Sequence, residues 1–427
     1  MYVPDAATAE TGKSGLRSVD RKVWEDMLDI VKCKILSAVN GLEMDAYLLS
    51  ESSLFISPHR LILKTCGTTL NLLGLPRILA IAREYAGLSK VYQCFYSRKA
   101  FMFPEKQLGP HRDWGMEVEF LDRIFDHGSA YTVGKVNGDH WLLYMTNPED
   151  LSSGSGTEMS SLASSFMEIY EERWAIVGQG GLYTLPLLPP TQDYTIEILM
   201  THLSPRSCAA FFTPDTVDPC GNGEFTPGMH AQQLTAKLGI SNIFPPRLTQ
   251  LDAYSFVPCG YSSNALIKWG DVSDGVERAG EGYYTIHVTP EEGWSYASFE
   301  CNVPLAIRRH GGAIDNPEDI PDLRTLIQRV VRIFEPGKLT MTLFVASAED
   351  GNASDVDGCE TAGEDAQRAF KAALTRIPKR SSPGNLYSGE SPAIEKGSSL
   401  VKAYKRTDKI NYEFGGYDLA FASFEMI

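Results

Sequence analysis

A serine that follows a glutamate inside an apolar run is the first candidate for chemistry in this chain. Residues 48–56 read Leu-Leu-Ser-Glu-Ser-Ser-Leu-Phe-Ile, which places Glu51 directly before Ser52. A serine hydroxyl can attack the carbonyl carbon of the preceding residue and convert that peptide bond into an ester. Elimination from the ester leaves a pyruvoyl group on a new N-terminus. The backbone can therefore supply an electrophile without a bound cofactor.

A second run, Lys-Thr-Cys-Gly-Thr-Thr, follows at residues 64–69. Cys66 stands apart from the other cysteines because it lies between Thr65 and Gly67 at the end of an expected strand, where its side chain can meet a ligand. Together the two runs closely resemble the eukaryotic S-adenosylmethionine decarboxylases. In that family the Glu-Ser bond is cut in this way, and the pyruvoyl group decarboxylates the substrate.

The resemblance implies a proenzyme that cuts itself at Glu51–Ser52 into a small chain, residues 1–51, and a large chain, residues 52–427. Ser52 would become the pyruvoyl group and form a Schiff base with the amine of S-adenosylmethionine, which accepts electrons as CO2 leaves. The product would be decarboxylated S-adenosylmethionine, the aminopropyl donor for spermidine and spermine. Neither a metal nor pyridoxal phosphate is implied.

A second pair of motifs extends the resemblance. Residues 256–262 read Phe-Val-Pro-Cys-Gly-Tyr-Ser, and residues 284–291 read Tyr-Thr-Ile-His-Val-Thr-Pro-Glu. The family pattern assigns processing roles to Ser262 and His287, and a neutral imidazole is a suitable base for the Cα proton that elimination removes. Cys66 is the implied proton donor to the carbon that loses CO2.

The same resemblance implies substrate contacts. Phe256 would stack on the adenine, Glu291 would bind the ribose hydroxyls, and Leu49 would contribute backbone contacts. The resemblance runs from about Leu16, and the Phe-Glu-Gly segment with which the family opens has no counterpart before that residue. Because that segment supplies a second stacking aromatic, its loss is expected to weaken substrate binding by about 1 kcal/mol.

Acidic residues alternate with apolar ones further along the chain. Asp193, Thr195 and Glu197 share one face of an expected strand, with neighbours roughly 7 Å apart. If that face lies between packed sheets, its carboxylates need a cation. With Glu300, these residues match the putrescine activator site of animal family members, and Lys64 and Phe95 match its rim. A diamine could bridge the acids.

Composition limits the other classes of function. The chain has 427 residues, a net charge of −15 and eight cysteines without paired CxxC spacing. This charge argues against a broad nucleic-acid or anionic-membrane surface, and the cysteine spacing supports neither a disulfide scaffold nor a zinc site. No stretch reaches the roughly 18 to 20 apolar residues of a membrane span. We therefore expect a cytoplasmic enzyme that binds S-adenosylmethionine, either a monomer or a dimer of the two-chain unit.

The expected elements define an α+β fold. We predict strands at 46–49, 54–56 and 61–64, a helix from Leu72 to Tyr85 with Thr68 or Thr69 as N-cap and Gly87 as its end, and a strand at 91–96, as one β-β-α-β unit with antiparallel pairing. Further strands are predicted at 194–199, 209–212, 253–257, 283–288, 296–301, 339–345 and beyond Val401. Further helices are predicted at 232–238, 322–334 and 366–374.

The resemblance implies one decarboxylase domain over residues 1–427, a four-layer αββα sandwich of two antiparallel sheets flanked by helices. An internal duplication would give half-repeats at about 16–146 and 166–427. Segments 147–165 and 347–399 are rich in small and charged residues and are expected to form mobile loops.

Two other classes of function stay open. A catalytically weak homologue that activates a competent decarboxylase partner would explain the missing opening segment, but such homologues tend to lose the processing serine, which is present here. A diamine-binding module without catalysis would explain Asp193 and Glu197, but it leaves the two long motifs unused.

Overall fold

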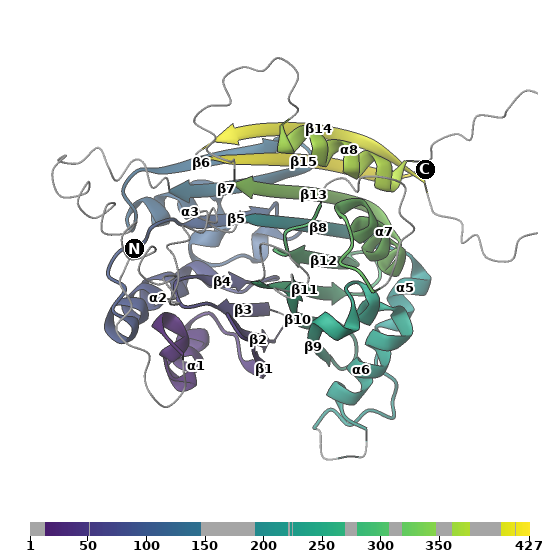
Figure 1. The fold of residues 1–427 in the computed structure, drawn as a ribbon, viewed down its shortest axis with the longest axis horizontal. Helices are drawn as coiled ribbons and strands as arrows, with labels where there is room; N and C mark the ends of the chain where they lie inside the picture. Colours follow the sequence, from purple (N-terminus) through teal and green to yellow (C-terminus); the bar gives the residue numbers. More distant parts are fainter. Residues whose placement is uncertain are drawn as a thin grey trace, which may run out of the picture. The chain divides into compact units, whose positions relative to one another are not determined.

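The computed structural model describes most of the chain, namely residues 13–50, 52–146, 193–220, 223, 225–269, 280–306, 318–346, 361–375, 403–414 and 416–427. Contacts divide the chain into two compact units, whose elements are labelled in Figure 1. Unit 1 comprises Met1–Lys32, Pro58–Arg60 and Gly67–Thr191. Unit 2 comprises Cys33–Ser57, Leu61–Cys66 and Gln192–Ile427. Glu51, loop 147–165 and most of loop 347–399 lie outside the described residues.

A small antiparallel sheet in unit 2 leads into the Glu-Ser bond. Its strands pair in chain order as β1 (Ile35–Asn40), β2 (Asp45–Leu49), β3 (Ser52–Ile56) and β4 (Leu61–Lys64). Leu49 of β2 pairs with Ser52 of β3, so only two residues connect these strands. Two-residue connections are the commonest hairpin turns. The predicted hairpin is confirmed, and Ser52 is the first residue of its second strand.

A larger antiparallel sheet of eight strands completes the β structure of unit 2. The strand order is β14-β15-β13-β8-β12-β11-β10-β9. The strands are β8 (Tyr194–Leu203), β9 (Thr249–Ser255), β10 (Tyr261–Trp269), β11 (Gly280–Thr289), β12 (Tyr296–Cys301), β13 (Pro336–Ala346), β14 (Tyr404–Phe414) and β15 (Tyr417–Met426). Sequence analysis missed β10, whose nine residues carry Ser262.

Helices cover one face of the eight-stranded sheet. They are α5 (Pro205–Ala210), α6 (Pro227–Leu238), α7 (Leu323–Phe334) and α8 (Ala362–Leu374), with short 3-10 turns at Ile240–Asn242 and Pro246–Leu248. Asp322 begins α7 because its carboxylate accepts a hydrogen bond from the Thr325 N–H at 2.8 Å. Apolar side chains of these helices share one core with alternate residues of the sheet, such as Ile196 and Ile198 of β8.

The opposite face of the eight-stranded sheet packs against the small sheet. Leu266 of β10 and Tyr283 of β11 share a hydrophobic cluster with Met44, Ala46 and Phe55. The rings of Phe55 and Tyr283 stack with their centroids 4.1 Å apart. Because side chains alternate along a strand, residues next to those of the helical core point into this space between the sheets. That space contains four of the predicted polar side chains, namely Glu197, Ser262, His287 and Glu300.

A buried carboxylate fastens the two sheets together. The turn between β1 and β2 directs the backbone N–H groups of Leu42, Glu43 and Met44 at the carboxylate of Glu281 on β11, over 3.1, 2.9 and 3.2 Å. A Cβ at Gly41 would lie 2.2 Å from Glu281 Oε2, so the approach requires glycine. Glu281 was not recognised from the sequence because this contact joins residues far apart in the chain.

Unit 1 combines three helices with a small sheet. Its elements are α1 (Arg21–Ile30), α2 (Asn71–Ala86), α3 (Trp114–Asp122), β5 (Phe95–Lys99), β6 (Gly128–Gly134) and β7 (His140–Thr146), with 3-10 turns at Gly15–Ser18, Pro104–Lys106 and Gly109–Arg112. The strand order is β5-β7-β6, all antiparallel. Gly87 ends α2 in the left-handed conformation, as predicted.

Three local predictions are wrong. Neither Thr68 nor Thr69 caps α2, whose N-cap is Leu70 without a side-chain hydrogen bond. The strand predicted at 91–96 lies at Phe95–Lys99 and pairs with β7 instead of the hairpin, because its partner comes from a later segment that local patterns do not reveal. Residues 209–212 are not a strand, since Ser204 caps a short helix that begins at Pro205.

The predicted α+β class, with antiparallel sheets flanked by helices, is confirmed. Unit 2 by itself contains two facing sheets and one helical layer. The two units do not coincide with the predicted halves at 16–146 and 166–427, because residues 33–57 and 61–66 group with the C-terminal part of the chain. The internal duplication stays a prediction.

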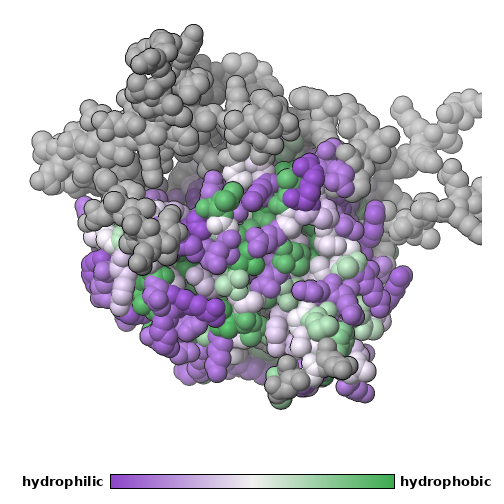
Figure 2. Space-filling model, turned by 60° about the horizontal axis from the view of Figure 1, so that its bottom comes forward, coloured by the Kyte–Doolittle hydropathy of each residue, from purple (hydrophilic) through white to green (hydrophobic). Residues whose placement is uncertain are grey.

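The described surface is mostly polar. Figure 2 shows one face, on which hydrophilic residues surround several groups of hydrophobic ones. Such isolated groups are ordinary on a folded protein. Within the described ranges, none of the helices has both the length and the apolar character needed to cross a bilayer.

Truncation of the shared core should destabilise the protein strongly. Phe299 of β12 is fully buried and stacks on Tyr284 with ring centroids 5.7 Å apart. A Phe299→Ala variant should lose about 3 to 5 kcal/mol of unfolding free energy, measured by urea denaturation. Leu42→Ala is the control, because Leu42 is 71% exposed and should change stability by less than about 0.5 kcal/mol. Equal losses in both variants would contradict the assigned core.

Candidate active site

His287 on β11 is the centre of a buried polar network between the two sheets of unit 2. Its Nδ1 atom lies 2.9 Å from Ser262 Oγ on β10, the neighbouring strand. Its Nε2 atom lies 3.0 Å from Ser53 Oγ on β3 and 3.1 Å from Thr285 Oγ1 on its own strand. The structure therefore brings together Ser262 and His287, two residues that the sequence motifs predicted.

The network continues from Ser53 to the neighbouring strand β10. Ser53 Oγ lies 2.6 Å from Asn264 Oδ1 and 2.9 Å from Thr285 Oγ1. Asn264 in turn donates from Nδ2 to the carbonyl of Tyr47 at 3.0 Å. Sequence analysis missed Ser53, Asn264 and Thr285. Their positions one or two residues from Ser52, Ser262 and His287 were visible, but their shared contacts depend on how the sheets pack.

Ser52 occupies a different environment from Ser53. Its side chain is fully buried, and its Oγ has no hydrogen-bond partner in the described part of the structure. Adjacent residues of a strand point to opposite faces, which explains why Ser53 contacts His287 and Ser52 does not. Leu49, paired with Ser52, is also fully buried. An unpartnered buried hydroxyl costs free energy, so Ser52 is a candidate for a reactive group.

Burial keeps His287 uncharged. Desolvation, assisted by the positive charge of Lys64, lowers the pKa of His287 to about 3. At neutral pH the ring therefore has one protonated nitrogen and one nitrogen with a free lone pair. A neutral imidazole beside serine hydroxyls can accept a proton, which is the role expected of a base.

Lys64 supplies the buried cation that the alternating carboxylates require. Lys64 is the last residue of β4. Its Nζ donates to Glu197 Oε1 of β8 and to Glu300 Oε2 of β12, the latter at 2.6 Å. Tyr283 donates to the other Glu300 oxygen at 2.7 Å. Burial opposes the charge on Lys64, but the two carboxylates outweigh it and raise the pKa of the ammonium, so it stays protonated.

Of the other residues predicted to form the diamine site, Asp193 directly precedes β8, Thr195 lies at the start of β8, and Phe95 lies on β5. Asp193 accepts a hydrogen bond from the Tyr417 hydroxyl at 3.0 Å, a partner that sequence analysis missed. Thr195 is half-buried and lies between Asp193 and Glu197 on the same face. Phe95 begins β5 in unit 1 with a side chain that is 44% exposed. Its role at the rim stays a prediction.

The predicted substrate residues Phe256 and Glu291 follow β9 and β11, the two strands on either side of β10. Phe256 begins the turn from β9 to β10 and donates its N–H to Gly260 O at 3.0 Å. A Cβ at Gly260 would lie 3.4 Å from both the Phe256 ring and Val288 O, which places this turn beside the end of β11. Glu291 follows β11. Burial raises the pKa of the Cys259 thiol, and the negative charge of Glu291 and its hydrogen bond to that thiol raise it further. One Glu291 oxygen, Oε2, is buried without a partner among the described contacts.

Cys66 lies just beyond β4, two residues after Lys64. Its side chain is partly exposed. It interacts electrostatically with Tyr296 of β12, whose pKa is raised by burial and also responds to Lys64 and Glu197. The structure thus groups Cys66 with the Lys64 cluster in unit 2.

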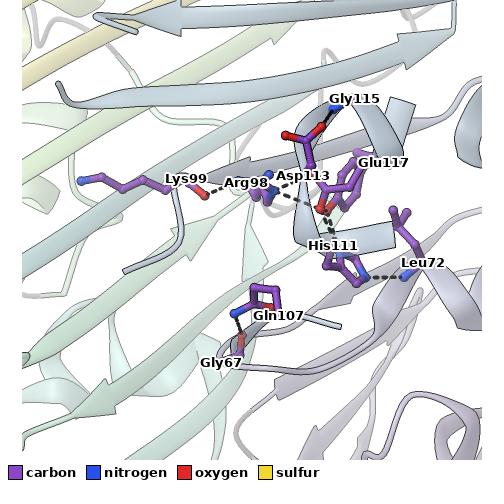
Figure 3. A network of polar contacts seen from close by, with 10 residues as sticks. Gly67, Leu72, Arg98, Lys99, Gln107, His111, Asp113, Gly115 and Glu117 are labelled. Atoms are coloured by element: carbon purple, nitrogen blue, oxygen red, sulfur yellow. Dashed lines mark hydrogen bonds and ion pairs between the residues drawn. The ribbon is translucent and has the colours of Figure 1, made fainter. Parts of the chain in front are cut away.

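A separate polar network lies in unit 1, as Figure 3 shows. Glu117 of α3 is fully buried and accepts hydrogen bonds from Tyr96 at 2.7 Å, from Arg98 Nε at 2.8 Å and from His111 Nδ1 at 2.8 Å. His111 Nε2 accepts the Leu72 N–H over 3.4 Å. This imidazole therefore satisfies part of the N-terminus of α2, the task that sequence analysis gave to Thr68 or Thr69.

Comparison with known proteins gives the family. A sequence model of the adenosylmethionine decarboxylase family matches residues 1–425. The chain belongs to the adenosylmethionine decarboxylase family. The match begins at residue 1, so the resemblance starts earlier than Leu16, where sequence analysis placed it.

Individual proteins of this family are similar in sequence to the chain. The S-adenosylmethionine decarboxylase proenzyme of Xenopus laevis is 36% identical over 337 residues, which cover 79% of this chain and 78% of that protein. The proenzyme of Saccharomyces cerevisiae is 32% identical over 371 residues, covering 82% and 80%. The crystal structure of the Trypanosoma brucei AdoMetDC-delta26 monomer aligns over 88% of this chain and 99% of that chain, with 18% identity and a TM-score of 0.45.

Within the described ranges, no group of three or more His, Cys, Asp or Glu side chains is arranged to hold a metal ion. The Ser52 hydroxyl is buried and without a hydrogen-bond partner among the described residues.

The depressed pKa of His287 should make stability depend on pH. An unfolded histidine titrates near pH 6.5, so below that pH the unfolded chain binds a proton that the folded chain excludes until about pH 3. The contribution of His287 is thus complete above pH 6.5 and falls by about 1.4 kcal/mol per pH unit below it. Urea unfolding from pH 7 to 5 should show this loss in a Ser52→Ala chain relative to Ser52→Ala/His287→Gln. Parallel curves would contradict the low pKa.

Removal of the Lys64 charge should destabilise the folded protein, because two buried carboxylates lose their cation. Lys64→Met leaves Glu197 and Glu300 without their cation, which should lower the unfolding free energy by about 3 to 5 kcal/mol in urea titrations. Adding Glu197→Gln and Glu300→Gln should recover part of the loss. Lys338→Met is the matched control, because Lys338 pairs with Glu425 on the exposed surface and should cost less than about 1 kcal/mol.

Proposed function

We propose that this chain is the precursor of a pyruvoyl-dependent S-adenosylmethionine decarboxylase and that it cuts its own backbone at Glu51–Ser52. The observation that carries the proposal is the buried, unpartnered hydroxyl of Ser52, next in sequence to the serine that contacts His287 at 3.0 Å. Membership of the decarboxylase family and the proenzyme names of its relatives support it.

Cleavage begins with an acyl shift. Ser52 Oγ attacks the carbonyl carbon of Glu51, and the hydroxyl proton moves to the amide nitrogen of Ser52 as the C–N bond breaks. An ester and a free amine replace the peptide bond. Because Leu49 of β2 pairs with Ser52 of β3, the Glu51–Ser52 bond belongs to a connection of only two residues, and the attacking hydroxyl and its target carbonyl are adjacent in the chain.

Elimination then separates the two chains. A base removes the Cα proton of Ser52, and the electrons of that bond form a Cα–Cβ double bond as the Cβ–Oγ bond breaks. The carboxylate of Glu51 leaves with the oxygen and becomes the new C-terminus. The remaining enamine gains a proton at Cβ, and water hydrolyses the imine with release of ammonia to give the pyruvoyl cap. His287, neutral and buried, is the base that the structure offers.

A pyruvoyl group formed from Ser52 would supply an electrophilic carbonyl for the substrate amine and a sink for the electrons released on decarboxylation. Cys66 then supplies a proton to the carbon that has lost CO2. Phe256 supports the adenine by stacking, and Glu291, with one oxygen free of described hydrogen bonds, accepts from the ribose hydroxyls. Leu49 lines the bond that is cut. The product donates aminopropyl groups in polyamine synthesis.

The acidic cluster is a candidate activator site for putrescine. Glu197 and Glu300 share one ammonium, that of Lys64, and Asp193 has a neutral tyrosine as partner. A diamine carries two positive charges, which carboxylates attract. Binding there can act on the base, because the positive charge of Lys64 affects His287.

Self-cleavage can be tested on one gel. Purified wild-type protein should separate into a small and a large chain, with the small chain ending at Glu51 by mass and the large chain resistant to Edman sequencing. Ser52→Ala should stay intact and release no labelled CO2 from carboxyl-labelled S-adenosylmethionine. An intact wild-type chain would overturn the proposal and favour the regulatory homologue, which should then stimulate an added competent decarboxylase. A small chain ending at Ser52 would instead make Ser53 the nucleophile.

Diamine control should depend on the acidic residues. Putrescine should accelerate CO2 release by the cleaved wild-type enzyme, and Asp193→Asn should abolish the acceleration, because it removes one of the carboxylates proposed to bind the diamine. Asp408→Asn is the control, since Asp408 lies on the edge strand β14. Equal stimulation of the wild type and Asp193→Asn would contradict this site.

A further inference from the structure

The network around His287 has a defined direction of hydrogen bonding, which begins at Asn264. One end of its amide lies 3.0 Å from the carbonyl oxygen of Tyr47, which can only accept. That end must be the NH2 group, so the other end is the oxygen, 2.6 Å from Ser53 Oγ. The backbone of Tyr47 thus fixes the orientation of the Asn264 amide.

Ser53 has one hydroxyl proton, and Asn264 takes it. An amide oxygen has only lone pairs, so the 2.6 Å contact requires Ser53 to donate. The Ser53 oxygen then faces His287 Nε2 with lone pairs over 3.0 Å. Two lone pairs at that distance repel each other, and the contact is favourable only when Nε2 carries the proton.

The opposite nitrogen of the ring must then be free. A neutral imidazole holds one proton, and desolvation keeps His287 neutral. With the proton on Nε2, the lone pair of Nδ1 faces Ser262 Oγ at 2.9 Å, and the Ser262 hydroxyl donates to it. Thr285 Oγ1 lies 3.1 Å from Nε2 and shares that proton.

On the basis of the self-cleavage proposed above, we propose that Asn264, acting through Ser53, fixes the Nε2-protonated tautomer of His287, so that Nδ1 is the base and receives the proton through Ser262. In the elimination step, Ser262 Oγ takes the Cα proton of Ser52 and passes its own proton to Nδ1. The electrons of the Cα–H bond form the new double bond, and the Glu51 carboxylate leaves. Asn264 and Ser53 are positioning residues, since they act through His287.

The four side chains of this hydrogen-bonded network are almost completely buried. Ser53 is fully buried, Asn264 and Ser262 are each 1% exposed, and His287 is 5% exposed. Water is therefore a poor substitute for a lost partner, and the tautomer should respond to the protein groups alone. Polar networks of this kind hold a ring in one protonation pattern because each alternative leaves a buried group unpaired.

The tautomer can be measured directly in the uncut Ser52→Ala protein. Long-range nitrogen–proton NMR spectra of histidine-labelled protein distinguish the two tautomers, and His287→Gln in the same background identifies the signal. We expect the Nε2-protonated pattern. An Nδ1-protonated His287 would overturn the proposal whether or not the wild-type chain cleaves itself.

Variants separate the positioning role from a structural one. Asn264→Leu removes the acceptor for Ser53, frees the Ser53 proton for Nε2 and should shift His287 to the Nδ1-protonated form. In otherwise wild-type chains it should slow self-cleavage about 100-fold or more and let the ester accumulate, so that hydroxylamine releases the small chain.

Ser263→Ala is the matched control. Ser263 lies between Ser262 and Asn264 on β10, is fully buried, and takes no part in this network. The Ser263→Ala chain should cleave at the wild-type rate. Ser53→Ala removes the hydroxyl that connects Asn264 to His287 without enlarging a side chain, so it should behave like Asn264→Leu. If wild type cleaves and both Asn264→Leu and Ser53→Ala cleave equally fast, the inference fails while the proposed function stands. If wild type never cleaves, the proposed function itself fails.

Discussion

The ammonium of Lys64, held between two carboxylates of the facing sheet, is the interaction on which the site depends. Glu197 and Glu300 project from β8 and β12 into the space between the sheets, where an unpaired charge is costly. Lys64 enters from the small sheet and neutralises part of this charge. Its own charge, together with burial, keeps His287 neutral and available as a base. One buried ion pair thus couples sheet packing to proton transfer.

The hairpin and the base come from opposite sheets of unit 2. The connection between β2 and β3 holds the predicted cleavage site, whereas β10 and β11 carry Ser262 and His287. The carboxylate of Glu281 on β11 accepts three hydrogen bonds from the β1–β2 turn. Stacking of Phe55 on Tyr283 adds apolar contact between the same sheets. These contacts have no catalytic chemistry of their own. They hold the strand that begins at Ser52 against the strands that carry Ser262 and His287.

Short-range patterns predicted much of this. The alternation in residues 193–198 placed Asp193, Thr195 and Glu197 on one face and predicted a cation there if that face lay between packed sheets, which is the position of Glu197 beside Lys64. The strands at 296–301 and 61–64 and the end of α2 at Gly87 were found because turns, caps and alternation are local. The predictions of a strand at 91–96 and of Thr68 or Thr69 as the cap of α2 were wrong, since β7 and His111, which contact these elements, lie tens of residues away in the sequence.

The sequence by itself determined the reactive types and their order: Glu51 before Ser52, Cys66 after a strand, and Ser262 and His287 in two further motifs. It did not reveal that Ser53 meets His287, that Asn264 orients Ser53, or that Lys64 lies between Glu197 and Glu300. Those facts needed the tertiary structure. A strand's period of two tells which residues share a face, but only the packing of two sheets decides which side chains meet across it.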